Sequence, residues 1–218
     1  MKNNRSKRLI YFSLIIVLSI AVIIGSIFLF SKPSQIEAQV ASAMSDIVGK
    51  MNDENYMQGK FLENGMPLAM SSNPYDFIKD NEAFDKIIAL GMEALPELVK
   101  IQNNNDMYGS LERYLIAIAI ETISKTDLKA YEEFAWDQAD AFARNWSKFE
   151  KEAAIAIPTI VNDGKLNNNE KLAKLAKYGM LSLQTMESDK NINQTSLFGD
   201  VKDKFEKSSR DELVQLAK

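Results

Sequence analysis

The sequence predicts an all-α protein in which a single N-terminal transmembrane helix precedes a helical domain. Three observations lead to this fold class. Residues 9–30 carry no charged side chain, apolar residues after residue 32 recur at intervals of three and four, and no stretch alternates apolar and polar residues as a half-buried strand would. A composition of 46% hydrophobic residues with 9 Gly and 5 Pro suits a mainly helical globular chain.

Residues 9–30 form the predicted transmembrane anchor. As a helix of about 22 residues, the segment would be roughly 33 Å long, enough to cross a hydrocarbon core of about 30 Å. A cleaved secretory signal is the competing interpretation, because a basic stretch precedes the segment and Ala41-Ser42-Ala43 has the form of a cleavage site. The apolar run is longer than a typical signal core and the triplet lies well beyond its end, so we favour the uncleaved anchor.

Basic residues at the N-terminus predict the orientation of that anchor. Lys2, Arg5, Lys7 and Arg8 lie before the apolar run, and the positive-inside rule makes residues 1–8 a cytoplasmic tail. The predicted localisation is therefore the cell membrane, with a single pass and the C-terminal domain extracytoplasmic. The absence of cysteine is compatible with that oxidising compartment.

Residues 31–72 are expected to form a juxtamembrane helix followed by a linker. One helical stripe is defined by Ile36, Val40, Met44, Ile47 and Met51. The stretch 52–73 lacks a clean period and contains Gly59, Gly65 and Pro67, which is typical of a connection.

Residues 73–218 are expected to form a helical ectodomain of short helices. Asn73 can cap a helix that has Pro74 at its first position, and Ser209 with Glu212 fits a capping box. Further helices are expected at 82–90, at 92–102 with Pro96 in the first turn, after a Ser110 cap to residue 123, at 128–149, at 153–161 with a break at Pro158, and at 171–178.

An internal repeat is suggested by the alignment of residues 81–95 with residues 169–183. In each copy an apolar helical stripe ends at a glycine, Gly91 or Gly179, which can adopt the left-handed conformation that closes one helix and orients the next. The alternative is coincidence between two amphipathic helices that both end in glycine.

The first copy contains Leu90-Gly91, then Ala94-Leu95-Pro96, and after a loop Leu111-x-Arg113 at the start of an Ala-rich helix. This pattern resembles the HEAT-type α-helical repeat over residues 82–124, and more weakly over residues 170–187, where Gln184 replaces the proline. The resemblance implies a HEAT-like stack of helix pairs whose exposed face binds another protein.

Composition excludes several kinds of chemistry. Without His or Cys the chain has no thiolate nucleophile, no Ser-His pair and no zinc site of the nitrogen and sulfur kind. After residue 32, acidic residues outnumber basic ones, so the domain repels nucleic-acid phosphates. We expect no cofactor, no nucleic-acid partner and no small-molecule ligand.

Two sets of polar side chains could still carry chemistry. A helix through residues 133–140 would place three carboxylates on one face near Trp136 and Trp146, which would suit a glycan hydrolase, although a solvated acidic face is the commoner explanation. These carboxylates belong to Glu133, Asp137 and Asp140.

The second set occupies ligand positions of a calcium-binding EF-hand loop. Its members are Asp189, Asn191, Asn193, Thr195 and Asp200. Gln194 replaces the usual glycine and Asp200 is shorter than the usual glutamate, so any such site would be weak, and a polar loop explains the same residues. Methionines such as Met44 and Met70 could form an adaptable binding surface, although methionine more often fills a core.

The sequence therefore predicts a non-catalytic, membrane-anchored scaffold or binding protein of the cell envelope, with another envelope protein as its partner. No catalytic, cofactor-binding or metal-binding residue is predicted. Two alternatives stay open: a carboxylate-dependent envelope glycan hydrolase, and a helical protein that is secreted after signal cleavage.

Overall fold

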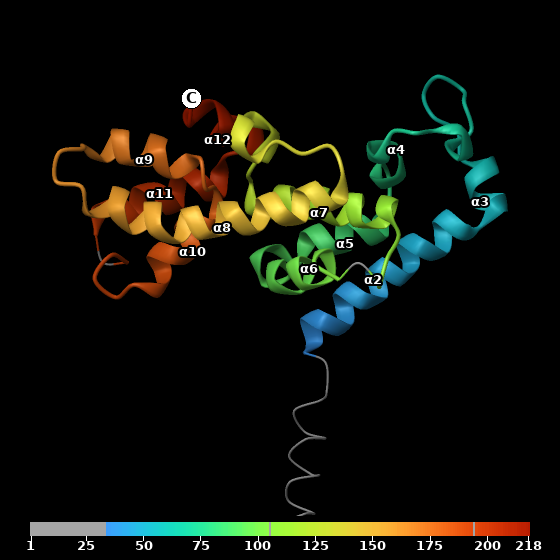
Figure 1. Cartoon of the computed structure of the whole chain (residues 1–218), viewed down its shortest axis with the longest axis horizontal. Helices are drawn as coiled ribbons and strands as arrows, with labels where there is room; N and C mark the ends of the chain where they lie inside the picture. Colours follow the sequence, from blue (N-terminus) through green and yellow to red (C-terminus); the bar gives the residue numbers. More distant parts are fainter. Residues whose placement is uncertain (1–33, 105, 194) are drawn as a thin grey trace, which may run out of the picture. The chain divides into compact units, whose positions relative to one another are not determined.

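A computed structural model describes residues 34–104, 106–193 and 195–218, and this part of the chain is helical (Figure 1). The helices are α2 (Gln35–Asn52), α3 (Glu54–Gly59), α4 (Pro74–Ile78), α5 (Glu82–Ala89), α6 (Leu95–Gln102), α7 (Ser110–Ser124), α8 (Ala139–Asn162), α9 (Asn168–Ala176), α10 (Met180–Ser188), α11 (Ser196–Lys207) and α12 (Arg210–Leu216). Single 3₁₀ turns are η1 (Leu68–Met70), η2 (Gly91–Glu93), η3 (Leu128–Ala130) and η4 (Glu132–Phe134). The expected all-α class is confirmed for the described ranges.

The membrane-spanning part of the predicted fold class is corrected. The predicted anchor, residues 9–30, lies outside the described residues. Among the residues that are described, no helix is both long enough and apolar enough to cross a membrane. The two longest helices show why: α2 carries Glu37 and Lys50, and α8 carries Asp140 and a series of further charges that a hydrocarbon core would exclude. The predicted localisation rests on residues 1–30 and stays a prediction.

The hydrophobic core described below lies in the compact unit of residues 39–218. Helix α7 lies at the centre of this core. Its residues 115–120 are all at most 3% exposed, and the helix packs against α4, α5, α6, α8 and α10. A helix that is apolar on all sides is stable only when other elements surround it, which explains this central position.

Helix α8 contributes a row of aromatic side chains to the same core. Phe142, Trp146 and Phe149 are at most 1% exposed and follow the i, i+4, i+7 spacing of one helix face. The ring centroids of Phe142 and Trp146 are 5.7 Å apart, and those of Trp146 and Phe149 are 5.8 Å apart. This row fixes α8 against α7 and against the turns before it.

The predicted break at Pro158 is wrong, because α8 continues through it to Asn162. Proline removes the hydrogen bond to the carbonyl four residues earlier, which belongs to Ala154. Ala154 is exposed, so water can satisfy that carbonyl. At the end of the helix, Lys171 Nζ donates to the carbonyl oxygen of Val161 at 2.7 Å.

The expected single helix over residues 128–149 is also wrong. Two 3₁₀ turns, η3 and η4, occupy its first part, and α8 begins only at Ala139. The cause is tertiary: the Glu121 carboxylate on α7 accepts hydrogen bonds from the Leu128 backbone N–H at 2.8 Å and from Trp136 Nε1 at 3.1 Å. These bonds hold the chain against α7 in a course that a helix could not follow.

Most local start signals are confirmed. Asn73 caps α4 with Pro74 in its first turn, and Ser209 with Glu212 forms the capping box of α12. Ser110 is an exception, because it is the first residue of α7 and the N-cap is Gly109, which makes no side-chain capping bond. The predicted connection after α2 also contains helix α3, which Asp53 starts by accepting from two backbone N–H groups.

Both glycines of the suggested repeat have a positive φ angle, but the ψ angle of Gly179, −134°, lies outside the left-handed helical region that was expected. The φ angle of Gly91 is +61° and that of Gly179 is +50°, and each lies between two helices. No repeat is identified in the described structure beyond this shared feature, so the internal repeat and the HEAT resemblance stay predictions.

Candidate functional site

Exposed apolar side chains concentrate in α4 and in the stretch that precedes it. The part of the chain that the structure describes has five large hydrophobic side chains that are strongly exposed, and three of them lie within residues 60–80, here called the 60–80 segment. These are Phe61, 62% exposed, Met70, 69% exposed, and Tyr75, 43% exposed. Single exposed hydrophobics are ordinary, but three that lie within 15 residues of one another along the chain make this segment a candidate binding surface.

Backbone hydrogen bonds order this segment. The Leu62 N–H donates to the Met66 carbonyl, and the Leu68 N–H donates to the Lys60 carbonyl, both at 2.8 Å. Gly65, at φ +79°, makes the tight turn between them. Leu68 is 1% exposed and attaches the segment to the core. The exposed side chains are therefore presented on a fixed backbone.

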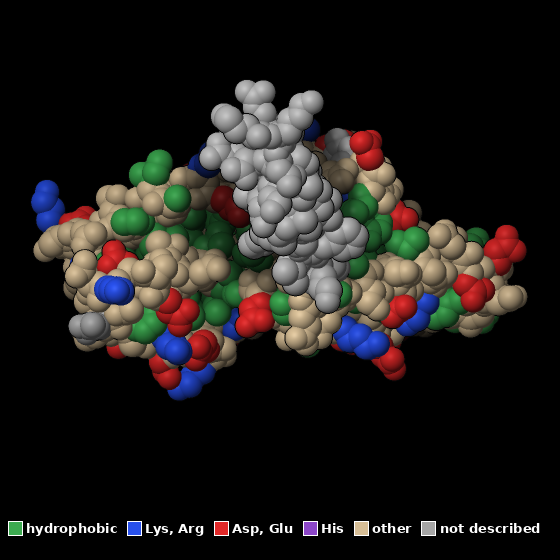
Figure 2. All heavy atoms as spheres, turned by 90° about the horizontal axis from the view of Figure 1, so that it is seen from below, with side chains coloured by type: hydrophobic (Ala, Val, Ile, Leu, Met, Phe, Trp, Pro, Cys, Tyr) green, Lys and Arg blue, Asp and Glu red, His purple; other side chains and the backbone are tan. Residues whose placement is uncertain are grey.

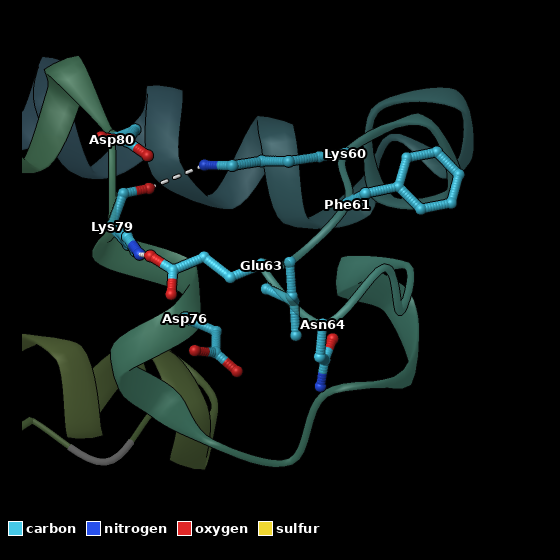
Figure 3. Close-up of a pocket in the computed structure, with 8 residues that line it drawn as sticks. Lys60, Phe61, Glu63, Asn64, Asp76, Lys79 and Asp80 are labelled. Carbon is cyan, nitrogen blue, oxygen red and sulfur yellow. Dashed lines mark hydrogen bonds and ion pairs between the residues drawn. The ribbon is translucent and has the colours of Figure 1, made fainter.

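A cavity of about 330 Å³ lies within this segment, between residues 60–64 and residues 76–80 (Figure 3). Lys60 Nζ donates to the Lys79 carbonyl oxygen at 2.7 Å, and Lys79 Nζ forms an ion pair with Glu63. Figure 3 shows the Phe61 ring turned away from this ion pair. The polar groups bond to one another, and the aromatic ring is left to solvent.

The charge states in this cavity do not suit acid–base catalysis. The hydrogen bond with Lys79 lowers the pKa of the Glu63 carboxyl, and the same bond raises the pKa of the Lys79 amine. Both groups are thus held more firmly in their charged forms at neutral pH. A general acid or base would need a pKa moved toward neutrality, and the pKa values of Glu63 and Lys79 move in the opposite direction.

The three predicted carboxylates do not form one helical face. Glu133 lies in η4, Asp137 lies in the bend before α8, and Asp140 lies in the first turn of α8. Glu133 accepts from Lys177 Nζ at 3.3 Å, whereas Asp140 is 2.6 Å from Arg113 Nη1. The spacing argument required a continuous helix through residues 133–140, and that helix is not formed.

The two tryptophans near these carboxylates are core residues. Trp136 is 4% exposed and Trp146 is 1% exposed. A sugar-binding aromatic platform needs an accessible ring face, which neither side chain offers. The geometry therefore does not support the glycan-hydrolase alternative.

The residues of the predicted calcium loop bond locally. Asp189 Oδ1 accepts from the Asn191 N–H at 2.8 Å, and Asn193 Nδ2 donates to the Glu187 carbonyl at 3.3 Å. Thr195 caps α11, so Asp200 lies inside that helix and accepts from Asn168 Nδ2 at 3.3 Å. Within the described ranges, no group of three or more acidic side chains is placed to hold a metal ion.

Sequence reasoning missed a buried carboxyl. Glu121 on α7 is 1% exposed, and burial raises its pKa. Its hydrogen bonds to Trp136 and Leu128 hold the turns before α8, so its role is positional. The only signal in the sequence was an acid inside the apolar run 115–123.

Two of the methionines considered for a binding surface, Met44 and Met70, lie in different environments. Met44 is 1% exposed and belongs to the core, whereas Met70 is 69% exposed and belongs to the 60–80 segment.

Comparison of the chain with family models, with curated proteins and with solved structures finds no match.

Proposed function

We propose that this chain is a non-catalytic helical scaffold that binds another protein through the 60–80 segment. The observation that carries the proposal is the concentration of Phe61, Met70 and Tyr75 as exposed side chains on an ordered backbone. The partner would present an apolar surface of its own. We take this partner to be another protein of the cell envelope.

The energetics of apolar burial support such a site. Burying a side chain of the size of Phe or Met contributes about 1.5–3 kcal/mol relative to leaving it exposed. A few such anchors near the centre of an interface account for most of the affinity of typical complexes. Phe61 and Met70, each more than half exposed, have the most area to bury.

The charged groups beside these anchors would act mainly in specificity. Lys60, Glu63 and Lys79 bond to one another around the cavity, so a partner would meet an organised polar rim. Polar rims of this kind contribute to partner selection and to association rate more than to affinity.

Isolation of the full chain from the cells that produce it tests the proposal. The triple variant Phe61→Ser/Met70→Ser/Tyr75→Ser should keep the helical circular dichroism spectrum but elute as a smaller species in size-exclusion chromatography. The matched control is Met107→Ser/Ile155→Ser, which removes exposed apolar side chains outside the 60–80 segment. Elution of the triple variant with the same partner as the unmodified chain would refute the proposal.

A further inference from the structure

A groove of about 540 Å³ lies along the first half of α8 and gathers basic side chains. Arg113 forms its base, and Arg144, Lys148 and Lys151 line it from α8. Asp140 is the one carboxylate among its lining residues. Because acidic residues outnumber basic ones in the whole chain, this concentration of positive charge departs from the average surface. On the face drawn in Figure 2, Lys and Arg side chains are interspersed with those of Asp and Glu.

The Arg113 guanidinium is buried and fixed in place. The residue is 5% exposed, Nη1 lies 2.6 Å from Asp140 Oδ1, and Nη2 donates to the Gln102 carbonyl at 3.2 Å. Its Nε is buried without a hydrogen-bond partner in the described structure. Asp140 balances the charge of Arg113, so the net positive charge of the groove comes from the three exposed cations of α8, Arg144, Lys148 and Lys151.

The three α8 cations lie on one helix face. Their spacing is i, i+4, i+7, which places neighbouring side chains within about 6 Å of each other, where like charges repel. None of the three forms an ion pair with a carboxylate of the described residues, in contrast to Lys177, Lys202 and Lys207. An anionic ligand would remove this repulsion.

The length of the row favours an extended anion. From Arg144 to Lys151 the helix rises by about 10 Å, a distance that one phosphate group cannot span. Carboxylates at i, i+4 and i+7 of a partner helix repeat with the same spacing as the cations. A nucleic acid long enough to bind would continue beyond the groove over a net acidic surface, which would repel its phosphates.

We infer that the groove formed by Arg113, Arg144, Lys148 and Lys151 is a docking site for an acidic helical segment of a protein. The site is separate from the 60–80 segment and does not depend on the function proposed for that segment. The buried Arg113–Asp140 pair fixes the base of the groove, and the three exposed cations of α8 pair with successive carboxylates of the ligand.

Fluorescence anisotropy with the full chain tests the inference. The probe is a labelled Ala-based helical peptide with Glu at i, i+4 and i+7, and the control peptide has Gln at these positions. The Glu peptide should bind and the Gln peptide should not, and raising the salt concentration from about 50 to about 300 mM should weaken binding several-fold.

Matched charge variants locate the binding. Arg144→Gln/Lys148→Gln/Lys151→Gln should weaken binding of the Glu peptide by at least about tenfold with an unchanged helical spectrum, since each lost pair is worth a few-fold in affinity. Lys165→Gln/Lys174→Gln/Lys190→Gln removes the same charge from other exposed positions and should change the Kd less than about twofold. Equal losses in both variants would show a net-charge effect and overturn the inference. Displacement of the peptide by millimolar inorganic phosphate, or tighter binding of a single-stranded oligonucleotide than of the peptide, would also overturn it.

Discussion

Two corners of the molecule use the same device, a glycine at positive φ between consecutive helices, but differ in their surroundings. Gly91, between α5 and α6, has φ +61°, and a Cβ added there would meet no atom within 4 Å. Gly179, between α9 and α10, has φ +50° and ψ −134°, and its Cβ would lie 2.2 Å from the Ser124 carbonyl oxygen. The first corner is open, and the second is closed by the end of α7.

This difference separates two reasons for a glycine that look the same in a sequence. At Gly91 the backbone angle alone favours glycine, whereas at Gly179 the angle and the lack of space both require it. The end of α7 also reaches α11, because Lys125 Nζ donates to the carbonyls of Phe205, Glu206 and Ser208 at 2.8–3.0 Å. The Gly179 corner is therefore where α7, α10 and α11 are joined.

The largest effect is expected for Gly179→Ala. The added methyl group would overlap backbone oxygen that cannot move without shifting α7, so the free energy of unfolding should fall by about 3 kcal/mol or more. Urea denaturation followed by circular dichroism measures this change. If the loss were no larger than that of Gly91→Ala, the end of α7 would not restrict the space at Gly179.

A smaller loss is expected for Lys125→Met. The substitution keeps the aliphatic stem and the positive φ of +53° but removes the donor to three carbonyls, and the free energy of unfolding should fall by about 2 kcal/mol. Hydrogen exchange should accelerate at the end of α11, near residues 204–208. Lys174→Met is the control, because Lys174 is exposed and lies on α9. Equal stability of the two variants would show that α7 and α11 are not joined by Lys125.

Gly91→Ala should cost about 1–2 kcal/mol, the penalty of a left-handed conformation for a residue with a Cβ. Nothing else is expected to change, since the site has room for a methyl group. The same urea titration measures it. A loss as large as that of Gly179→Ala would mean that the Gly91 corner is also packed.

The smallest effect at neutral pH is expected for Glu121→Gln. This variant tests the burial of the Glu121 side chain, which holds the turns before α8 against α7. Burial raises the pKa of Glu121 above its unfolded value of 4.5, so the native state binds a proton more tightly than the unfolded state. The stability that this provides is complete below pH 4.5 and is lost as pH rises through the native pKa.

Glutamine does not titrate, and its side-chain oxygen can still accept from Trp136 and Leu128. The stability of Glu121→Gln relative to the unmodified chain should therefore increase as pH rises from about 4.5 to 8. Urea titrations at several pH values test this. A constant difference across that range would show that the pKa of Glu121 is not raised in the native state.

Local signals in the sequence were sufficient for much of the fold. Asn73 with Pro74, and Ser209 with Glu212, act through neighbouring backbone atoms, and the positive φ of each corner glycine follows from its place after an apolar stripe. The turns before α8 could not be predicted, because Glu121 bonds to residues that are distant along the chain.

The candidate site was less accessible to sequence reasoning. Whether Phe61 and Met70 are core or surface depends on how Leu68 attaches the segment, and spacing along the chain does not contain that information. The basic groove also needed the fold, because Arg113 belongs to α7 and its counter-charge Asp140 to α8. The hypothesis of a three-carboxylate site failed because it assumed a continuous helix through residues 133–140. Hydrogen bonds from Glu121 hold the chain before α8 in turns instead.

Site-specific photo-crosslinking in the cells that produce the protein tests the central claim most directly. A photoreactive phenylalanine analogue would replace Phe61, Met70 or Tyr75 in turn, with Ile155 as the control because it is 73% exposed and lies on α8. We predict the same crosslinked partner protein from the three positions of the 60–80 segment and none from Ile155. Crosslinking of equal strength at Ile155, or none within the segment, would contradict a protein-binding role for this surface.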